Sequence, residues 1–416
     1  MTSTVIIGAG QAGLAMSRCL GQQSIDHVLL ERGEVANSWR TERWDSLRLL
    51  TPNWQSALPE YCYNGNDPDG FMAMPEVIDF ISGYASRISA PVHCGVNVTE
   101  VTQTDFGYLV DTNQGSWLCR TLVIASGAFN IPMIPKAASA LPACISSISS
   151  QQYRRPEQLQ KGGVLVVGGS ATGLQLAQEI HRSGREVTLS VGEHVRMPRQ
   201  YRGRDIFWWM EQSGLARQSY KEADDINRAR RVPSPQLSGS TNEDMNLNCL
   251  TDQGVKLVGR FSGVHHSKAL FSGSLSNVCK LADLKMRRLI GRFDEWAMGV
   301  DIDHRVFDQA EFEPTRISSV PSLDLDFSSG EIKTIVWATG FRPDYSWLKL
   351  PVLNHKGMLK HDGGVVEAPG LYVMGLPFMR QRKSSFIHGV SDDARALCQH
   401  LVGYLDDPTG IRQQCA

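Results

Sequence analysis

The stretch Thr4-Val5-Ile6-Ile7-Gly8-Ala9-Gly10-Gln11-Ala12-Gly13 decides the fold of this chain. An apolar strand runs into glycines with the G-x-G-x-x-G spacing, and apolar residues on helical spacing follow. Gly8 permits a tight turn, Gly10 lets a pyrophosphate approach the backbone, and Gly13 lets the helix pack on the strand. Glu31 ends the next apolar run, about 20 residues on, where an acid binds a ribose hydroxyl. The pattern predicts a β-α-β unit that binds a dinucleotide.

A second glycine turn, Gly168-Gly169-Ser170-Ala171-Thr172-Gly173, follows another apolar run. Ser170 replaces the middle glycine, and its small side chain still lets a phosphate approach the backbone. The next apolar run ends at 189–191 without an acid, and arginines follow it. Arginine there suits a 2′-phosphate, so the pattern favours NADPH over NADH, bound by Arg196 or Arg199. The alternatives are a turn that binds nothing and a solvated basic loop.

The length of 416 residues predicts more than one domain, because a single core stops growing at roughly 250–300 residues. We expect an α/β fold with two Rossmann-like dinucleotide-binding domains. The first domain is predicted to be discontinuous, with residues 1–158 and 320–416, and the second to span 159–319. A weaker pattern near 195–300 predicts a lid-like insertion. Further expected elements are a loop at 232–248 and helices at 281–297 and 391–404.

Composition and charge exclude several classes of protein. The formal net charge of −1 gives no global field toward nucleic acid or anionic lipid. The nine cysteines include no C-x-x-C pair, so we expect no metal site and no thioredoxin-like redox centre. Their odd number, without a secretory signal, suggests reduced thiols in the cytoplasm. No apolar stretch reaches about eighteen residues, so no membrane span is expected.

Two more strand-like runs end in small residues. The segments 122–127 and 335–340 are apolar and end in Ala-Ser-Gly and Ala-Thr-Gly. Small residues let a chain turn close to another element.

With these segments the chain resembles the flavin-containing monooxygenase superfamily, in particular its bacterial branch of predicted flavoproteins of the cation-efflux-associated type. The shared segments are the two glycine turns with Glu31, residues 37–40 and 44–52, Ala338-Thr339-Gly340, and 370–375. The resemblance implies that NADPH reduces FAD and that the reduced flavin forms a C4a-(hydro)peroxyflavin with dioxygen. One oxygen atom then passes to a small organic substrate at a nitrogen, sulfur or carbonyl centre.

The resemblance also assigns residues. FAD contacts are expected from Gly8, Gly10, Gly13, Glu31, Trp39, Arg40, Leu49, Gly340 and Gly375. NADPH contacts are expected from Gly168, Ser170, Thr172, Gly173, and Arg196 or Arg199. Many relatives carry a flavin-side asparagine at the position of Leu50, and Asn53 is the nearest substitute. His388 follows a cationic segment that passes the flavin in the family, so Asn53 and His388 are the catalytic candidates. A hydrogen-bonded, half-buried histidine is the alternative for His388.

One departure from the family leaves the function open. The family's linker fingerprint, F-x-G-x-x-x-H-x-x-x-F/Y, places Ala143, Ile145 and Ser149 where Phe, Gly and His belong, and only Tyr153 fits. One alternative is therefore an NAD(P)H oxidase or flavin reductase that produces hydrogen peroxide. Another is a flavin-binding redox sensor or partner-binding protein. The missing C-x-x-C disfavours a disulfide reductase, and the sequence is compatible with an oligomer.

Overall fold

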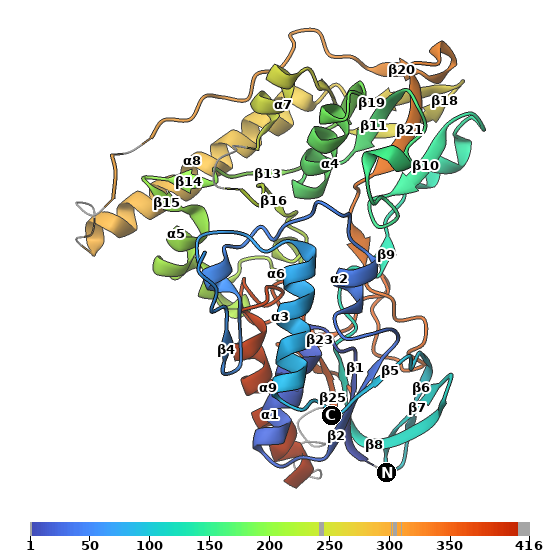
Figure 1. The fold of residues 1–416 in the computed structure, drawn as a ribbon, viewed down its shortest axis with the longest axis vertical. Helices are drawn as coiled ribbons and strands as arrows, with labels where there is room; N and C mark the ends of the chain where they lie inside the picture. The colour runs from blue at the N-terminus through green and yellow to red at the C-terminus, as the bar shows by residue number, and fades with distance from the viewer. Residues whose placement is uncertain (1, 241–244, 301, 303–305, 309, 407–416) are drawn as a thin grey trace.

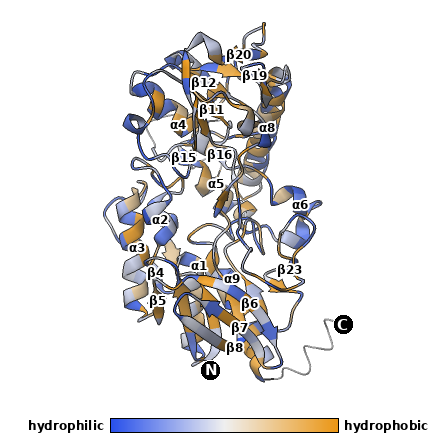
Figure 2. Cartoon of the chain, turned by 90° about the vertical axis from the view of Figure 1, so that its right-hand side faces the viewer, coloured by the Kyte–Doolittle hydropathy of each residue, from blue (hydrophilic) through white to orange (hydrophobic). Residues whose placement is uncertain are grey.

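The computed structural model describes residues 2–240, 245–300, 302, 306–308 and 310–406. Its α/β architecture forms two bodies at opposite ends of the molecule, each built around a parallel sheet (Figure 1). Figure 2, turned by 90°, shows the same separation of the two sheets. The expected α/β fold with two Rossmann-like domains is therefore confirmed. Among the residues described, no helix is both long and apolar enough to cross a membrane.

The first domain carries the N-terminal glycine turn. Its elements are β1 (Thr2–Ile7), α1 (Gln11–Gln22), β2 (His27–Glu31), α2 (Asn37–Thr41), β3 (Ala57–Leu58), β4 (Tyr61–Cys62), α3 (Met74–Arg87), β5 (Val92–Cys94), β6 (Val98–Thr104), β7 (Gly107–Thr112), β8 (Gly115–Ile124), β23 (His361–Asp362), β24 (Val365–Val366), β25 (Leu371–Val373) and α9 (Val390–Asp406). The main sheet has the order β23-β24-β25-β8-β1-β2-β5, with β25, β8, β1, β2 and β5 parallel. Val5 and Ile6 of β1 are fully buried, as expected for a strand covered on both faces.

The second domain carries the other glycine turn. Its sheet consists of parallel strands in the order β10 (Ser146–Ser149), β21 (Ile332–Trp337), β11 (Gly163–Val167), β12 (Val187–Ser190) and β17 (Lys256–Val258). Helix α4 (Ala171–Arg182) packs on β11 and β12, and α7 (Leu247–Gln253) packs on α4. Val164 and Val166 of β11 are fully buried, which agrees with the continuous apolar run.

The order of strands in the two sheets places both domain boundaries at residues other than those that the sequence predicts. Strand β10 lies before residue 158 and β21 lies after residue 320, yet both belong to the second sheet. The chain instead crosses between the domains at β9 (Ile131–Pro132) and β22 (Phe341–Arg342), which pair with each other antiparallel. The apolar pattern predicted the strands but did not show which sheet each strand joins.

The segment 195–300 is more than a lid, since its strand β17 forms the edge of the second sheet. Its other elements are β13 (Val195–Arg196), β14 (Gln200–Tyr201), β15 (Arg204–Asp205), α5 (Ile206–Gln212), α6 (Ile226–Ala229), β16 (Pro235–Gln236), β18 (Phe261–His265), β19 (Lys268–Phe271) and α8 (Leu275–Gly299). Strand β20 (Asp324–Asp326) pairs with β19. Helices α5 and α8 share a separate aromatic core, in which Trp209 stacks on Phe293 at a centroid distance of 5.9 Å. Figure 1 shows α5 and α6 of this segment between α8 and the helices of the first domain.

Candidate dinucleotide sites

The first glycine turn has the geometry that a pyrophosphate requires. Gly8 has φ +107°, and a Cβ there would lie 2.5 Å from the carbonyl oxygen of Ala125. A Cβ on Gly13 would lie 2.0 Å from the carbonyl oxygen of Gly8, so the fold itself demands both glycines. A Cβ on Gly10, in contrast, would meet no atom of the described residues within 4 Å. Gly10 therefore faces open space.

That open space lies at the N-terminus of α1. Among the described residues, no side chain caps this helix, and no acid lies in its first turn. The first N–H groups of a helix have no partner within the helix, and their dipole favours anions. The residues at the first turn therefore fit a bound pyrophosphate.

Glu31 lies at the end of β2 and is only 7% exposed. One carboxylate oxygen accepts from the backbone N–H of Ala9 at 2.8 Å, and the other from the N–H of Gly33 at 3.1 Å. A carboxylate has about four acceptor positions, so these two bonds leave capacity for ribose hydroxyls. The position agrees with the predicted role.

Other residues expected at FAD hold loops around the first turn. The indole N–H of Trp39 donates to the side-chain oxygen of Gln11 at 3.4 Å, in the first turn of α1. Arg40 donates to the carbonyl of Val35 at 2.9 Å and to the hydroxyl of Ser82 at 3.1 Å, which joins α2 to α3. The arginine is therefore bound to protein acceptors.

Gly375, Leu49 and Gly340 lie in different places. A Cβ on Gly375 would lie 3.1 Å from the Cβ of Ala12, so this glycine lies beside the first turn of α1. Leu49 is buried, and its N–H donates to the carbonyl of Met72 at 2.9 Å. Gly340, with φ +88°, follows β21 of the second sheet and lies at the crossing between the domains.

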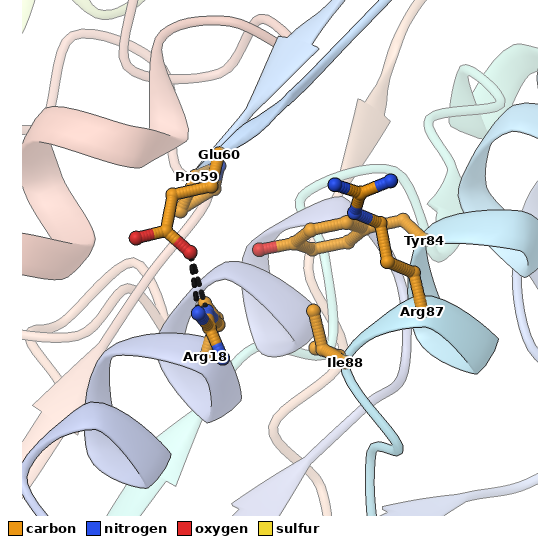
Figure 3. A pocket seen from close by; sticks show the side chains of 6 residues that line it. All are labelled: Arg18, Pro59, Glu60, Tyr84, Arg87 and Ile88. Atoms are coloured by element: carbon orange, nitrogen blue, oxygen red, sulfur yellow. Dashed lines mark hydrogen bonds and ion pairs between the residues drawn. The ribbon is translucent and has the colours of Figure 1, made fainter.

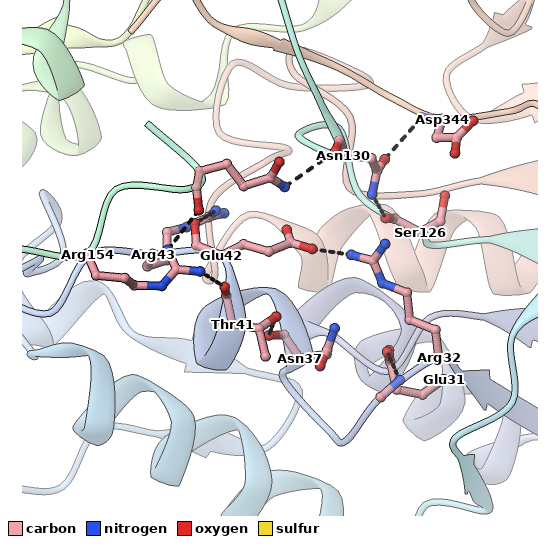
Figure 4. Close-up of polar contacts among 12 residues, drawn as sticks. Glu31, Arg32, Asn37, Thr41, Glu42, Arg43, Ser126, Asn130, Arg154 and Asp344 are labelled. Atoms are coloured by element: carbon pink, nitrogen blue, oxygen red, sulfur yellow. Dashed lines mark hydrogen bonds and ion pairs between the residues drawn. The ribbon is translucent and has the colours of Figure 1, made fainter. Parts of the chain in front are cut away.

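Polar contacts tie this crossing together (Figure 4). The side-chain amide of Asn130 donates to the carbonyl of Ser126 at 3.0 Å and accepts from the N–H of Asp344 at 3.2 Å. Arg154 donates to the carbonyl of Thr41, which joins α2 to the chain that follows β10. The loop at the end of β8 is thus held against both domain-crossing segments.

The second glycine turn repeats the first. Gly168 has φ +126°, and a Cβ there would lie 2.2 Å from the carbonyl oxygen of Ala338. A Cβ on Gly173 would lie 1.7 Å from the carbonyl oxygen of Gly168. Ser170 precedes α4 with φ −90° and ψ −177°, close to the −83° and −173° of Gly10. Thr172 lies in the first turn of α4, so the predicted residues come together at one helix N-terminus.

The residue that occupies the position of Glu31 in this second unit is Val191. The N–H of Gly8 donates to the carbonyl of Leu30, and the N–H of Gly168 donates in the same way to Ser190. Val191, the next residue, is fully buried and cannot bind a ribose hydroxyl. The absence of an acid, predicted from the sequence, is thus visible in the equivalent place.

The expectation that Arg196 or Arg199 meets a 2′-phosphate needs correction. The two side chains are 8% and 2% exposed. Arg196 pairs with Asp283 of α8 at 2.6 Å, and Arg199 pairs with Asp205 at 2.8 Å. Each guanidinium is therefore committed to a buried carboxylate, and the spacing of basic residues did not reveal those acids.

Arg260 is an exposed cation that the sequence reasoning missed. It follows β17, the strand beside β12, and its Cγ lies 3.6 Å from where a Cβ on Gly192 would be. Gly192 comes directly after Val191, at the carboxyl end of the sheet where ribose is bound in such folds. The signal in the sequence was an arginine just after a short apolar run at 255–258.

The two catalytic candidates hold the framework of the site. The side-chain amide of Asn53 donates to the carbonyl of Asp67 at 2.9 Å, and its oxygen accepts from the N–H of Met72 at 2.8 Å. His388 Nε2 lies 2.9 Å from Glu211 Oε1 and so joins the C-terminal segment to α5. Burial raises the pKa of Glu211, but the hydrogen bond with His388 and the positive charges around it, including Lys383 and Arg217, hold that pKa below its usual value.

Glu179 of α4 connects the two domains. It accepts from the hydroxyl of Tyr153 at 3.0 Å and from the hydroxyl of Ser46, which belongs to the first domain. Trp44, near Ser46 in the chain, is buried in the core of the second domain. Burial raises the pKa of Tyr153, and Glu179 raises it further, so this phenol remains a donor. Tyr153, the surviving residue of the linker fingerprint, thus has a structural role between the domains.

A small cavity of about 110 Å³ lies elsewhere, between α1 and α3 (Figure 3). Arg18, Glu60, Tyr84 and Arg87 line it, together with Pro59 and Ile88. Arg18 is in the second half of α1, far from the helix N-terminus at Gly10. This cavity is therefore separate from both glycine turns.

The two glycine turns, each at the carboxyl edge of a parallel sheet, define a two-domain dinucleotide-binding oxidoreductase. Residues 5–207 match the family model described as pyridine nucleotide-disulphide oxidoreductase. The chain is 30% identical over 410 residues to an uncharacterized CzcO-like oxidoreductase of Geobacillus kaustophilus, covering 97% of this chain and 99% of that one. The chain belongs to the CzcO-like oxidoreductase family.

Two further comparisons concern monooxygenases. The chain is 27% identical over 224 residues to the indole-3-pyruvate monooxygenase YUCCA6 of Arabidopsis thaliana, covering 50% of this chain and 52% of that one. A flavin-containing monooxygenase of Stenotrophomonas maltophilia superposes with a TM-score of 0.66 at 18% identity, covering 97% of this chain and 99% of that one. The structural likeness shows the fold, and the resemblance to flavin monooxygenases is confirmed.

Proposed function

We propose that this chain is an FAD- and NADPH-dependent monooxygenase that adds one oxygen atom to a small organic substrate. The observation that carries the proposal is the pair of matching helix N-termini, at Gly10 and Ser170, on two sheets that are joined by one crossing. The first turn with Glu31 fits FAD, and the second fits a nicotinamide dinucleotide. The monooxygenases among the similar proteins support the reaction class.

The cofactors supply the redox chemistry, since bound FAD can accept a hydride from NADPH and pass electrons to dioxygen. The residues of this chain bind, orient and exclude water. Arg199 and Glu179 each bridge the two domains and so fix the relative position of the two turns. No protein nucleophile is needed for this reaction.

The preference for NADPH has its own support. Val191 occupies the position where an acid would bind a 2′-hydroxyl and repel a 2′-phosphate. Arg260 supplies an exposed cation beside Gly192, in the place that Arg196 and Arg199 cannot fill. A guanidinium binds phosphate with charge-assisted, bidentate hydrogen bonds.

The test is a panel of amines, thioethers and ketones, incubated with the enzyme, NADPH and isotope-labelled dioxygen. We expect at least one compound to gain a single labelled oxygen atom and to speed NADPH consumption. If no compound on a broad panel gains labelled oxygen while NADPH is still consumed, the monooxygenase proposal fails.

The second candidate is an NAD(P)H oxidase, and one observation favours it. Ser149 stands where the family has histidine. Its backbone N–H and its hydroxyl both donate to the side-chain oxygen of Gln152, at 2.9 and 3.1 Å. Its side chain is fully buried and is thus not available to hold a nicotinamide. Stoichiometric hydrogen peroxide with every compound tested would support the oxidase. A flavin-binding redox sensor would show no steady turnover with NADPH in air.

A further inference from the structure

A segment of the second domain, residues 234–239, lies directly on the second glycine turn; we call it the strap. The carbonyl of Ser234 accepts from the N–H of Ala171 at 3.5 Å, in the first turn of α4. The side-chain N–H of Gln236 donates to the carbonyl of Gly169 at 2.7 Å. Strand β16, which includes Gln236, is held in turn by parallel pairing with β13. The strap therefore borders the place where the second pyrophosphate would bind.

The strap also reaches the first domain. The carbonyl of Leu237 accepts from the side-chain N–H of Gln175 at 2.9 Å, and the carbonyl of Ser238 accepts from Arg199 at 3.1 Å. A Cβ on Gly239 would lie 2.8 Å from the carbonyl oxygen of Leu49. The strap thus runs from the second glycine turn to the loop of Leu49 in the first domain, which is the direction in which the nicotinamide half of the cofactor would extend.

Gln236 carries an unsatisfied acceptor at this point. Its side chain is 1% exposed, and its oxygen Oε1 has no hydrogen-bond partner among the residues described. The amide cannot simply be turned over, because the carbonyl of Gly169 needs the N–H side. Buried polar atoms in native proteins nearly always have a partner, so this oxygen points to a donor supplied from outside the chain.

The chemistry of the cofactor limits which of its groups could donate a hydrogen bond to Gln236 Oε1. A pyrophosphate offers only acceptors at neutral pH, and it binds the N–H groups of the helix. The adenosine end would lie beside Val191 and Gly192, whereas the strap leads on from the turn to Gly239, beside the carbonyl of Leu49 in the first domain. The groups that would extend along the strap toward Leu49 are the hydroxyls of the nicotinamide ribose and the N–H of the carboxamide.

We propose that Gln236 is a positioning residue for the nicotinamide half of the cofactor, with Oε1 accepting from a ribose hydroxyl or the carboxamide N–H. The inference rests on the proposed function, because it assumes that the second turn binds a nicotinamide dinucleotide. The N–H of Ala171 makes only a long contact to the carbonyl of Ser234. A phosphate oxygen in place of that carbonyl would give this N–H a stronger, charge-assisted hydrogen bond.

The test compares Gln236→Leu with the wild-type, FAD-loaded enzyme by titration calorimetry. Two ligands are titrated: NADP⁺, and 2′,5′-ADP, which lacks the nicotinamide half. We expect Gln236→Leu to weaken NADP⁺ binding about tenfold, the size of one buried hydrogen bond, and 2′,5′-ADP binding less than twofold. The matched control is Gln175→Leu, which removes another amide bond to the strap; it should change both affinities less than twofold.

Two results would overturn the inference. Equal weakening of NADP⁺ and 2′,5′-ADP would mean that Gln236 only supports the glycine turn. An unchanged affinity for NADP⁺ would mean that water, and not the cofactor, satisfies Oε1. A wild-type enzyme that binds FAD but neither NADP⁺ nor 2′,5′-ADP would refute the proposed function itself, and flavin absorbance distinguishes this outcome from an unfolded preparation.

Discussion

The guanidinium of Arg199 donates to the carbonyl oxygen of Leu50 at 2.7 Å and so connects the second domain to the loop that carries Leu49 and Leu50 in the first. The same side chain lies over the rings of Phe71 and Phe207, at 4.9 and 5.3 Å, and pairs with Asp205. An arginine that looked from the sequence like a phosphate ligand is therefore part of the domain interface.

Replacing Arg199 by Ala is expected to destabilise the protein by about 3–5 kcal/mol, because it leaves Asp205 buried without its partner. Denaturant unfolding measures this loss. The double variant Arg199→Met, Asp205→Asn should lose less, since it removes both charges and keeps an acceptor for the N–H of Phe207 at the start of α5. Neither variant should change the ratio of specificity constants for NADPH and NADH. A tenfold shift in that ratio would show that Arg199 contacts the 2′-phosphate after all.

Gly10→Val is expected to abolish FAD binding while the protein still folds. A Cβ at this position meets no described atom of the chain within 4 Å, but the valine side chain would fill the space where the pyrophosphate approaches. Flavin content per chain, read from absorbance, is the measurement. The control is Gly21→Ala, also in open space but on the exposed end of α1, which should keep full flavin and gain up to about 1 kcal/mol. Full flavin content in Gly10→Val would contradict the assignment of the first turn.

Arg260→Ala should lower the specificity constant for NADPH roughly tenfold to a hundredfold and leave that for NADH unchanged. The reason is the loss of one charge-assisted contact to the 2′-phosphate, worth about 1.5–3 kcal/mol. Steady-state kinetics with both cofactors measure the effect. Arg287→Ala, which removes an exposed arginine of α8, is the control and should change neither constant. Parallel losses with NADPH and NADH would rule out a role for Arg260 in phosphate recognition.

His361 should make stability depend on pH. Burial first, and the charge of Arg230 second, lower its pKa to about 4, although Asp362 acts in the opposite direction. Between pH 6.5 and 4 the unfolded chain binds a proton at this residue and the folded chain does not, so the free energy of unfolding falls as the pH falls. His361→Asn keeps an acceptor for the N–H of Gly364 and should flatten this slope. Urea midpoints across that range give the comparison; identical slopes would show that His361 is not the group responsible.

The reduced enzyme is expected to release hydrogen peroxide readily when no substrate is present. Ser149 is bound to Gln152 and leaves the nicotinamide less firmly held, which admits water to a site that needs to be dry. Rapid mixing of NADPH-reduced enzyme with oxygen, with peroxide measured in parallel, tests this. Ser149→His alone should not prevent the leak, because Ala143 and Ile145 also differ from the family pattern. A flavin–oxygen adduct that outlasts many catalytic cycles would contradict the prediction.

Local patterns in the sequence predicted the two strand–turn–helix units to which we assign nucleotide binding. The strand–turn–helix units at Gly8 and Gly168 lie where expected, and the helices predicted at 281–297 and 391–404 fall within α8 and α9. These features depend on residues close together in the chain, namely glycines that a Cβ would exclude and apolar residues at helical spacing. The predicted loop at 232–248 contains β16 and, from Leu247, the start of α7.

Features that depend on distant residues were not predictable. The partner of Arg196 is Asp283, and Asn53 is bound by Asp67 and Met72. A basic or amide side chain has the same appearance in the sequence whether it is solvated, paired or catalytic. The domain boundaries failed for the same reason, because an apolar strand such as β21 fits either parallel sheet until its neighbours are known.

The place of β25 in the first sheet has a consequence for biosynthesis. This strand (Leu371–Val373) pairs with β8, and α9 after it packs on α1, so the first domain lacks a strand and a helix until nearly the whole chain has been translated. The strands of the other sheet all lie between Ser146 and Trp337, and they can assemble earlier on the ribosome. Nascent chains stalled just before β25 should therefore retain NADP⁺ yet fail to capture FAD, which makes flavin incorporation a late event in the maturation of this enzyme.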